Sequence, residues 1–159
     1  MVMGCFGKDM PTKQIAWVDE QSHYRDPIME LLADEEHKVD LYYDSFRGCE
    51  GLLSKPYDLI VTDASLDPDT RVGKKYCLRV GMFNTGILNL ISRVREEGPN
   101  RETPIVVFTT YGSLTPRKIT DQLEEMVKRL NATGNIEVVS FSDVGYVDFA
   151  EKVLGKYLL

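Results

Sequence analysis

The chain has 159 residues, 43% of them hydrophobic and 28% charged, which is typical of one globular domain with a full hydrophobic core. Its net charge is −6, and no basic cluster is dense enough for a nucleic-acid-binding surface. No apolar run is long enough to span a bilayer, and the start lacks the pattern of a secretory signal. We therefore expect a cytoplasmic protein that binds neither nucleic acid nor a membrane.

Cysteine usage agrees with a reducing compartment. Cys5, Cys49 and Cys77 are widely spaced and match neither a disulfide framework nor a zinc site. Residues 1–12 show no periodicity, so we expect a loose leader there. The domain is then expected over residues 13–159, with no effector or DNA-binding domain after it.

Strand and helix patterns alternate from the start of this domain. The sequence predicts a strand over 14–18 and then a helix that begins at Asp26-Pro27. Asp caps free N–H groups, and Pro suits the first position of a helix. A strand over 38–43 and a short helix over 45–54 follow, and we expect the two glycines of that helix to break it.

The next run, over 57–62, is short, apolar and rich in β-branched residues, so it predicts a strand buried on both faces. The connection after it is unusually long, and we regard residues 66–85 as an insertion. A helix over 85–97 follows, and Gly98-Pro99 ends it.

The remaining elements continue the alternation. The stretch PIVVFTTYG predicts a strand over 104–109, and Thr115-Pro116 caps another helix. A strand over 136–141 precedes a last helix, which starts near Asp143. We expect the buried face of this helix to comprise Val147, Ala150, Val153, Leu154 and Tyr157. Strands that alternate with helices pair in parallel, so the sequence predicts a doubly wound three-layer α/β domain.

Two of the predicted strands run into acidic residues. Asp63 follows the strand over 57–62, and Asp19-Glu20 follow the strand over 14–18. In open parallel sheets, ligands bind at the carboxyl ends of the strands, near the point where the strand order reverses. If these two strands are neighbours, three carboxylates meet in one crevice.

Taken together, these features resemble the receiver domain of two-component response regulators (the CheY-like family) over nearly the whole chain. In that family the first strand ends in an acidic pair, matched here by Asp19-Glu20. The third strand ends on the aspartate that accepts a phosphoryl group, matched by Asp63, and the fourth ends on Ser or Thr, matched by Thr109. The resemblance implies a five-stranded parallel sheet in the order 2-1-3-4-5.

Two features depart from the family pattern. The fifth strand should end in Lys, but Ser140 stands at that position and residues 136–142 contain no Lys. Val138 replaces the usual aromatic residue two positions earlier. The glycine expected soon after the phosphoryl-accepting aspartate is Gly86, so the insertion adds roughly fifteen residues, by comparison with the family. We expect this insertion to be a surface elaboration, with a partner-binding role as the alternative, because long loops are often functional.

The resemblance implies a chemistry for the acidic crevice. Mg²⁺ prefers oxygen ligands, which Asp19 or Glu20, Asp63 and a backbone carbonyl near Ser65 would supply. Asp63 would then accept a phosphoryl group, and the Thr109 hydroxyl would act as the switch that donates to it. The implied partners are a sensor histidine kinase or phosphotransfer protein and a downstream protein. The protein is expected to be a signalling module and not an enzyme, beyond its own phosphorylation and dephosphorylation.

Other readings stay open. A pseudo-receiver that binds a partner constitutively would explain the absent Lys. A phosphohydrolase with an Asp nucleophile would need a second Asp two residues later, where Ser65 and Gln21 stand. A flavodoxin-like FMN site is disfavoured because Asp19-Glu20 would repel a phosphate. Among the remaining conspicuous residues, we expect Trp17 in the core and His23 and His37 at the surface.

Overall fold

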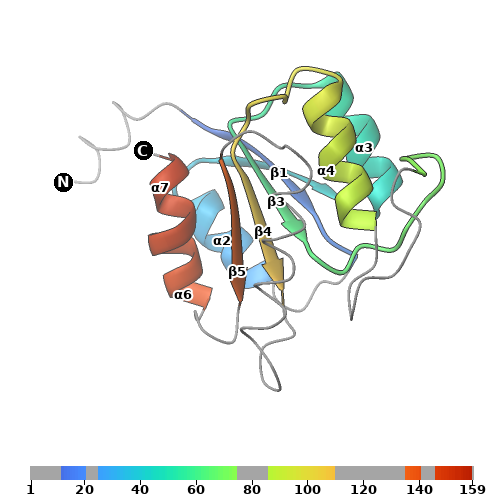
Figure 1. The fold of residues 1–159 in the computed structure, drawn as a ribbon. Helices are drawn as coiled ribbons and strands as arrows, with labels where there is room; N and C mark the ends of the chain where they lie inside the picture. Colours follow the sequence, from blue (N-terminus) through green and yellow to red (C-terminus); the bar gives the residue numbers. More distant parts are fainter. Residues whose placement is uncertain (1–11, 21–24, 75–85, 110–134, 141–145, 159) are drawn as a thin grey trace, which may run out of the picture.

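The computed structural model describes residues 12–20, 25–74, 86–109, 135–140 and 146–158. Its centre is a five-stranded parallel sheet in the order β2-β1-β3-β4-β5 (Figure 1). The strands are β1 (Gln14–Val18), β2 (Lys38–Tyr42), β3 (Leu59–Asp63), β4 (Ile105–Thr109) and β5 (Ile136–Ser140). The predicted fold class and strand order are therefore confirmed.

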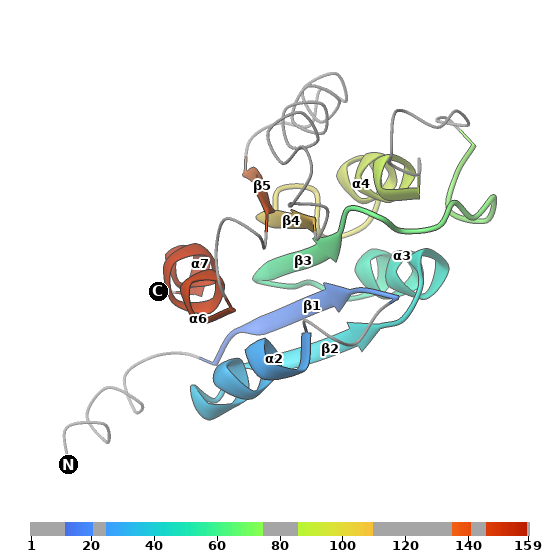
Figure 2. The same cartoon turned by 90° about the horizontal axis from the view of Figure 1, so that it is seen from below.

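Helices cover both faces of the sheet. On one face lie α3 (Ser45–Ser54) and α4 (Gly86–Glu96), as the view along the layers shows (Figure 2). The other face is covered by α2 (Arg25–Asp34) and by the last helical segment of the chain. That segment consists of α6 (Tyr146–Asp148), a π-helical stretch η1 (Phe149–Leu154) and α7 (Gly155–Leu158).

A cluster of three aromatic rings fixes the central strands against the last helical segment. Trp17 is fully buried, and its ring centroid lies 5.6 Å from that of Phe108 and 6.3 Å from that of Phe149. Aromatic rings at these separations contribute beyond the area they bury. The prediction that Trp17 belongs to the core is confirmed. No helix in the described ranges is long and apolar enough to cross a membrane.

The prediction that glycines break the helix over 45–54 was wrong, because α3 is continuous. Its glycines serve close packing instead. A Cβ added at Gly48 would lie 2.9 Å from a methyl group of Val18, and one added at Gly51 would collide with the ring of Tyr42. The missing side chains let α3 approach the sheet, which is a tertiary reason that local propensity does not contain.

Three smaller expectations also need correction. The strand predicted over 57–62 begins two residues later and includes Asp63. Val147 is 55% exposed, because Phe149 takes the buried face and residues two positions apart lie on opposite sides of a helix. The His37 side chain is only 6% exposed, and its Nδ1 accepts a hydrogen bond from the Lys13 backbone N–H at 3.3 Å.

Several predicted features lie outside the described residues. They are His23, the helix from Thr115, Cys5, Cys77, all but the last residue of the leader, and the second half of the insertion. The described half of the insertion is no simple surface elaboration. Leu66 and Val72 are buried in the core beneath α3 and α4.

Asn100 is a structural residue that the sequence analysis missed. It is fully buried, and its Nδ2 donates to the carbonyl oxygens of Leu52 at 2.6 Å and Lys55 at 2.8 Å. Its Oδ1 accepts from the Tyr57 backbone N–H at 2.9 Å and from the Thr103 hydroxyl at 3.0 Å. One side chain therefore joins the end of α3, the start of β3 and the loop before β4.

We predict that Asn100→Ala lowers the free energy of unfolding by about 2–4 kcal/mol, because it leaves several buried polar groups without partners. Urea denaturation measures this loss. The control is Glu97→Ala on the exposed surface nearby, which should change stability by no more than about 0.5 kcal/mol. Equal effects of the two substitutions would contradict the assigned role of Asn100.

Candidate functional site

The register of the central strands brings two aspartates side by side. Val18 of β1 is paired with Thr62 of β3, and Asp19 and Asp63 are the next residues of the two strands. Both are buried, with exposures of 1% and 6%. Backbone hydrogen bonds hold this edge of the sheet: Asp19 N–H donates to the Tyr42 carbonyl at 3.0 Å. The predicted meeting of acidic strand ends is therefore present.

Asp63 holds its proton unusually tightly. Its pKa is raised to about 7, mainly because burial disfavours the charged carboxylate. A hydrogen bond of 2.9 Å from the Ser65 backbone N–H opposes this shift. The negative charge of Asp19, a hydrogen bond with Asp19 and the charge of Glu20 raise the pKa further. The site therefore carries more buried negative charge than the protein groups neutralise.

Glu20 lies at the edge of the same site. Its Oε1 accepts a hydrogen bond from the Asp67 backbone N–H at 3.1 Å. Burial raises the pKa of Glu20 to about 7, and the nearby charges of Asp67 and Asp44 act in the same direction, while the Asp67 N–H opposes them. Glu20 is thus tied to the loop that follows β3.

The other predicted site residues occupy the expected edge of the sheet. Ser65 directs its backbone N–H at Asp63, and its hydroxyl is buried with no hydrogen-bond partner in the described structure. Thr109 and Ser140 are paired as the last residues of β4 and β5. Asp63 is paired with Phe108, so the Thr109 backbone lies one residue beyond Asp63 on the neighbouring strand.

These donors suit a hard cation, although they are not arranged as a finished metal site. The side chains that meet here offer oxygen atoms, the ligands that Mg²⁺ prefers. Two carboxyl groups that share a proton when buried would gain from a cation in its place. Among the described residues, no group of three or more His, Cys, Asp or Glu side chains is placed to hold a metal ion. Asp19 and Asp63 form the close pair, and Glu20, which accepts from the Asp67 N–H, lies near enough for its charge to raise the pKa of Asp63.

Comparison with known proteins agrees with this geometry. No protein-family model matches the chain. The chain is 34% identical over 102 residues to the transcriptional regulatory protein DltR of Streptococcus agalactiae serotypes III and V. This alignment covers 64% of the chain but only 37% of the length of those relatives.

Solved structures extend the likeness over 93% of the chain. The chemotaxis protein CheY4 of Vibrio cholerae matches 93% of the chain and 100% of its own, with a TM-score of 0.62 and 16% identity. The chain has the fold of a receiver domain. A second receiver domain, from the Pseudomonas aeruginosa sensor histidine kinase PA1611, matches 93% of the chain and 98% of its own. Its TM-score is 0.60 at 16% identity, and its structure is described with a magnesium ion in the active-site cleft. The predicted resemblance to receiver domains is confirmed at the level of the fold.

The raised pKa of Asp63 predicts how the stability of this domain depends on pH. Between about pH 4 and pH 7, the unfolded chain has released the proton that the folded protein still holds. In the presence of EDTA, the free energy of unfolding should therefore fall as the pH rises through this window.

Asp63→Asn should reduce this dependence, to which Glu20 also contributes because its pKa is raised as well, and should stabilise the protein at pH 8 by on the order of 2 kcal/mol, with little effect near pH 4. Urea denaturation at several pH values measures the difference. Glu151→Gln, an exposed carboxylate on η1, is the control and should leave the pH profile unchanged. A wild-type profile that rises from pH 5 to pH 8 would contradict the assigned environment of Asp63.

Proposed function

We propose that this receiver domain acts in two-component signalling. Asp63 accepts a phosphoryl group with the help of Mg²⁺ from a sensor histidine kinase or a phosphotransfer protein, and a downstream protein responds to the modified state. The observation that carries the proposal is the buried pair Asp19 and Asp63, held side by side by the β1–β3 register. The receiver fold around this pair supports it.

The chain offers a ligand set for the cation. Asp19, Glu20 and Asp63 would hold it, together with a backbone carbonyl near Ser65. A bound Mg²⁺ supplies positive charge that offsets the repulsion among these carboxylates and the charge of an incoming phosphoryl group. The charge of the cation that Asp19 and Glu20 help to hold would keep Asp63 ionised at neutral pH, although its pKa is about 7 in the absence of a cation.

Asp63 is the nucleophile in the proposed step. A carboxylate oxygen attacks the phosphorus atom of a phosphohistidine, an O–P bond forms, and the N–P bond to the departing imidazole breaks. The Ser65 N–H holds the other carboxylate oxygen in place at 2.9 Å. The Thr109 hydroxyl would donate to a phosphoryl oxygen and draw the end of β4 toward the site.

The absent Lys sets a limit on this chemistry. Ser140 ends β5, so this strand supplies no fixed cation opposite the metal. Arg71 of the insertion does not replace it, because its guanidinium pairs with Asp69 at 2.8 Å and stacks on the ring of Phe46 at 3.7 Å. We therefore expect phosphorylation to be slower than in receiver domains that carry the Lys.

Incubation with Mg²⁺ and acetyl phosphate tests the function directly. Wild-type protein should gain the mass of one phosphoryl group, and the gain should disappear with EDTA or in Asp63→Asn. The matched control is Asp148→Asn, an exposed aspartate on α6, which should be modified as fully as the wild type. No mass gain in the wild type, together with an Asp63→Asn variant that keeps full affinity for its partner, would favour a pseudo-receiver instead.

Removal of one proposed ligand gives a second test. Asp19→Asn should weaken Mg²⁺ binding by at least about tenfold, because it removes one of two buried carboxylates that face the cation. Isothermal titration calorimetry at pH 8 measures the affinity. Unchanged affinity would place the cation elsewhere.

A further inference from the structure

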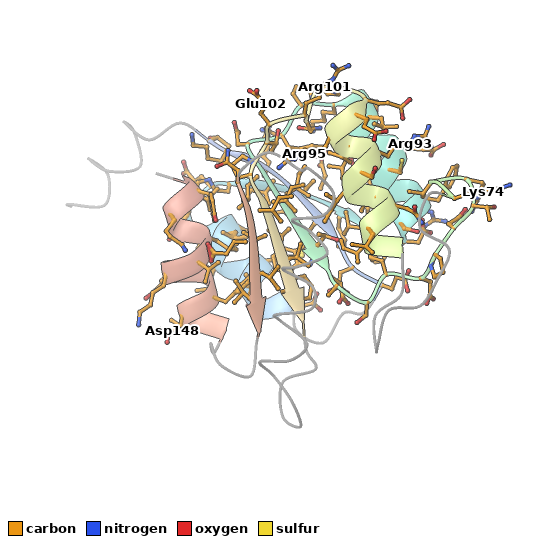
Figure 3. All side chains as sticks on the ribbon, viewed as in Figure 1. Lys74, Arg93, Arg95, Arg101, Glu102 and Asp148 are labelled. Carbon is orange, nitrogen blue, oxygen red and sulfur yellow. The ribbon has the colours of Figure 1, made fainter. Side chains whose placement is uncertain are left out.

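The loop that follows β3 is anchored at both ends of its described length. We call residues 64–74 the arm. At its far end the buried side chain of Val72 enters the core, and Arg93 Nη1 donates to the carbonyl oxygens of Arg71 at 2.9 Å and Val72 at 3.0 Å. Figure 3 shows Arg93 on α4, on the side of the molecule where the arm runs to Lys74.

At its near end the arm is held between a helix and the acidic site. The Ser45 hydroxyl, at the start of α3, donates to the carbonyl oxygen of Asp67 at 3.0 Å. The N–H of the same residue, Asp67, donates to Glu20 Oε1 at 3.1 Å. Ser45 is itself buried, so water does not readily replace its hydroxyl. A single residue of the arm thus links α3 to Glu20.

The first residue of α4 presses on the same part of the arm. A Cβ added at Gly86 would collide with the Leu66 carbonyl oxygen and would lie 2.7 Å from the Asp67 carbonyl oxygen. Glycine at position 86 therefore lets the backbone of α4 approach Leu66 and Asp67 closely, because any side chain there would clash with their carbonyl oxygens. Ser45 and Gly86 together leave Asp67 little freedom to move.

From this geometry we infer that Ser45 is a positioning residue: through the backbone of Asp67 it fixes the Glu20 carboxylate for cation binding at the acidic site. This inference rests on the proposed function, and it assigns a role to a residue and a loop that lie outside the acidic site itself.

The physical reason is preorganisation. A glutamate side chain has several rotatable bonds, and ordering it costs conformational entropy when a cation binds. The Asp67 N–H already holds one carboxylate oxygen of Glu20, so the carboxylate is partly ordered before a cation binds. The Ser45 hydroxyl keeps Asp67 in place. Without this hydroxyl, Glu20 would be less ordered in the free protein, and more conformational entropy would be lost when a cation binds.

The test compares two identical substitutions on one helix. Ser45→Ala removes the hydroxyl that holds Asp67. Ser54→Ala, at the other end of α3, removes a hydroxyl that donates to the backbone carbonyl of Glu50 at 2.7 Å. The Kd for Mg²⁺ is measured by calorimetry, and hydrogen exchange of the Asp67 amide is measured by NMR in metal-free protein. Ser45→Thr restores a hydroxyl at the same position and serves as the rescue variant.

Ser45→Ala should raise the Kd for Mg²⁺ by about tenfold, the usual size of an effect from a residue that orients a metal ligand. It should also speed exchange of the Asp67 amide, whereas Ser54→Ala should change neither quantity. Ser45→Thr should return both toward the wild-type values.

The results separate the two claims. Wild-type protein that binds no Mg²⁺ overturns the proposed function and the positioning role with it. Wild-type protein that binds Mg²⁺, with Ser45→Ala and Ser54→Ala of equal affinity, overturns only the role of Ser45. If Ser45→Ala does not fold, a wild-type affinity in Ser45→Cys, whose thiol is a weak donor, overturns that role in the same way.

Discussion

The parallel pairing of β1 with β3 is the constraint on which the rest of the molecule depends. It aligns two buried strands residue by residue, so the first polar side chains after them, Asp19 and Asp63, have to meet. Like charges in such a place oppose folding. The burial of the apolar residues before the two acids, Trp17 among them, on both faces of the sheet outweighs this repulsion. Packing fixes the register, and the register creates the site.

The same constraint leaves the charge of Asp63 incompletely neutralised. A carboxylate that is fully neutralised by protein groups has no use for a cation or a phosphoryl group. Within the part of the chain that the structure describes, the Ser65 N–H donates to Asp63, and the charges of the neighbouring acids oppose its effect on the pKa of Asp63. Ionisation of Asp63 lowers the free energy of unfolding. A cation that binds here would restore it, because a ligand that binds only the folded state stabilises that state.

The sequence predicted what depends on local pattern and missed what depends on distant contacts. Apolar runs located all five strands, and acids at their ends located the site, because burial on both faces leaves a clear signal in the chain. The sequence did not reveal the role of Asn100, since three of its four partners lie 43 to 48 residues away along the chain. The prediction for the glycines of α3 failed for the same reason. The ring of Tyr42, a residue of β2, leaves no room for a side chain at position 51.

The absent Lys and the anchored arm both bear on how the negative charge of the acidic site is compensated. With Ser140 at its end, the described strand β5 brings no positive charge to the site. The polar support that the described residues show comes from the opposite side, from the backbone N–H groups of Ser65 and Asp67. These N–H dipoles can act on the site only while the backbone of the arm keeps its position. Ser45 and Gly86 restrict that backbone at Leu66 and Asp67. If the site holds a cation as proposed, its electrostatic support would therefore come from the ordered arm and not from a side-chain cation on β5.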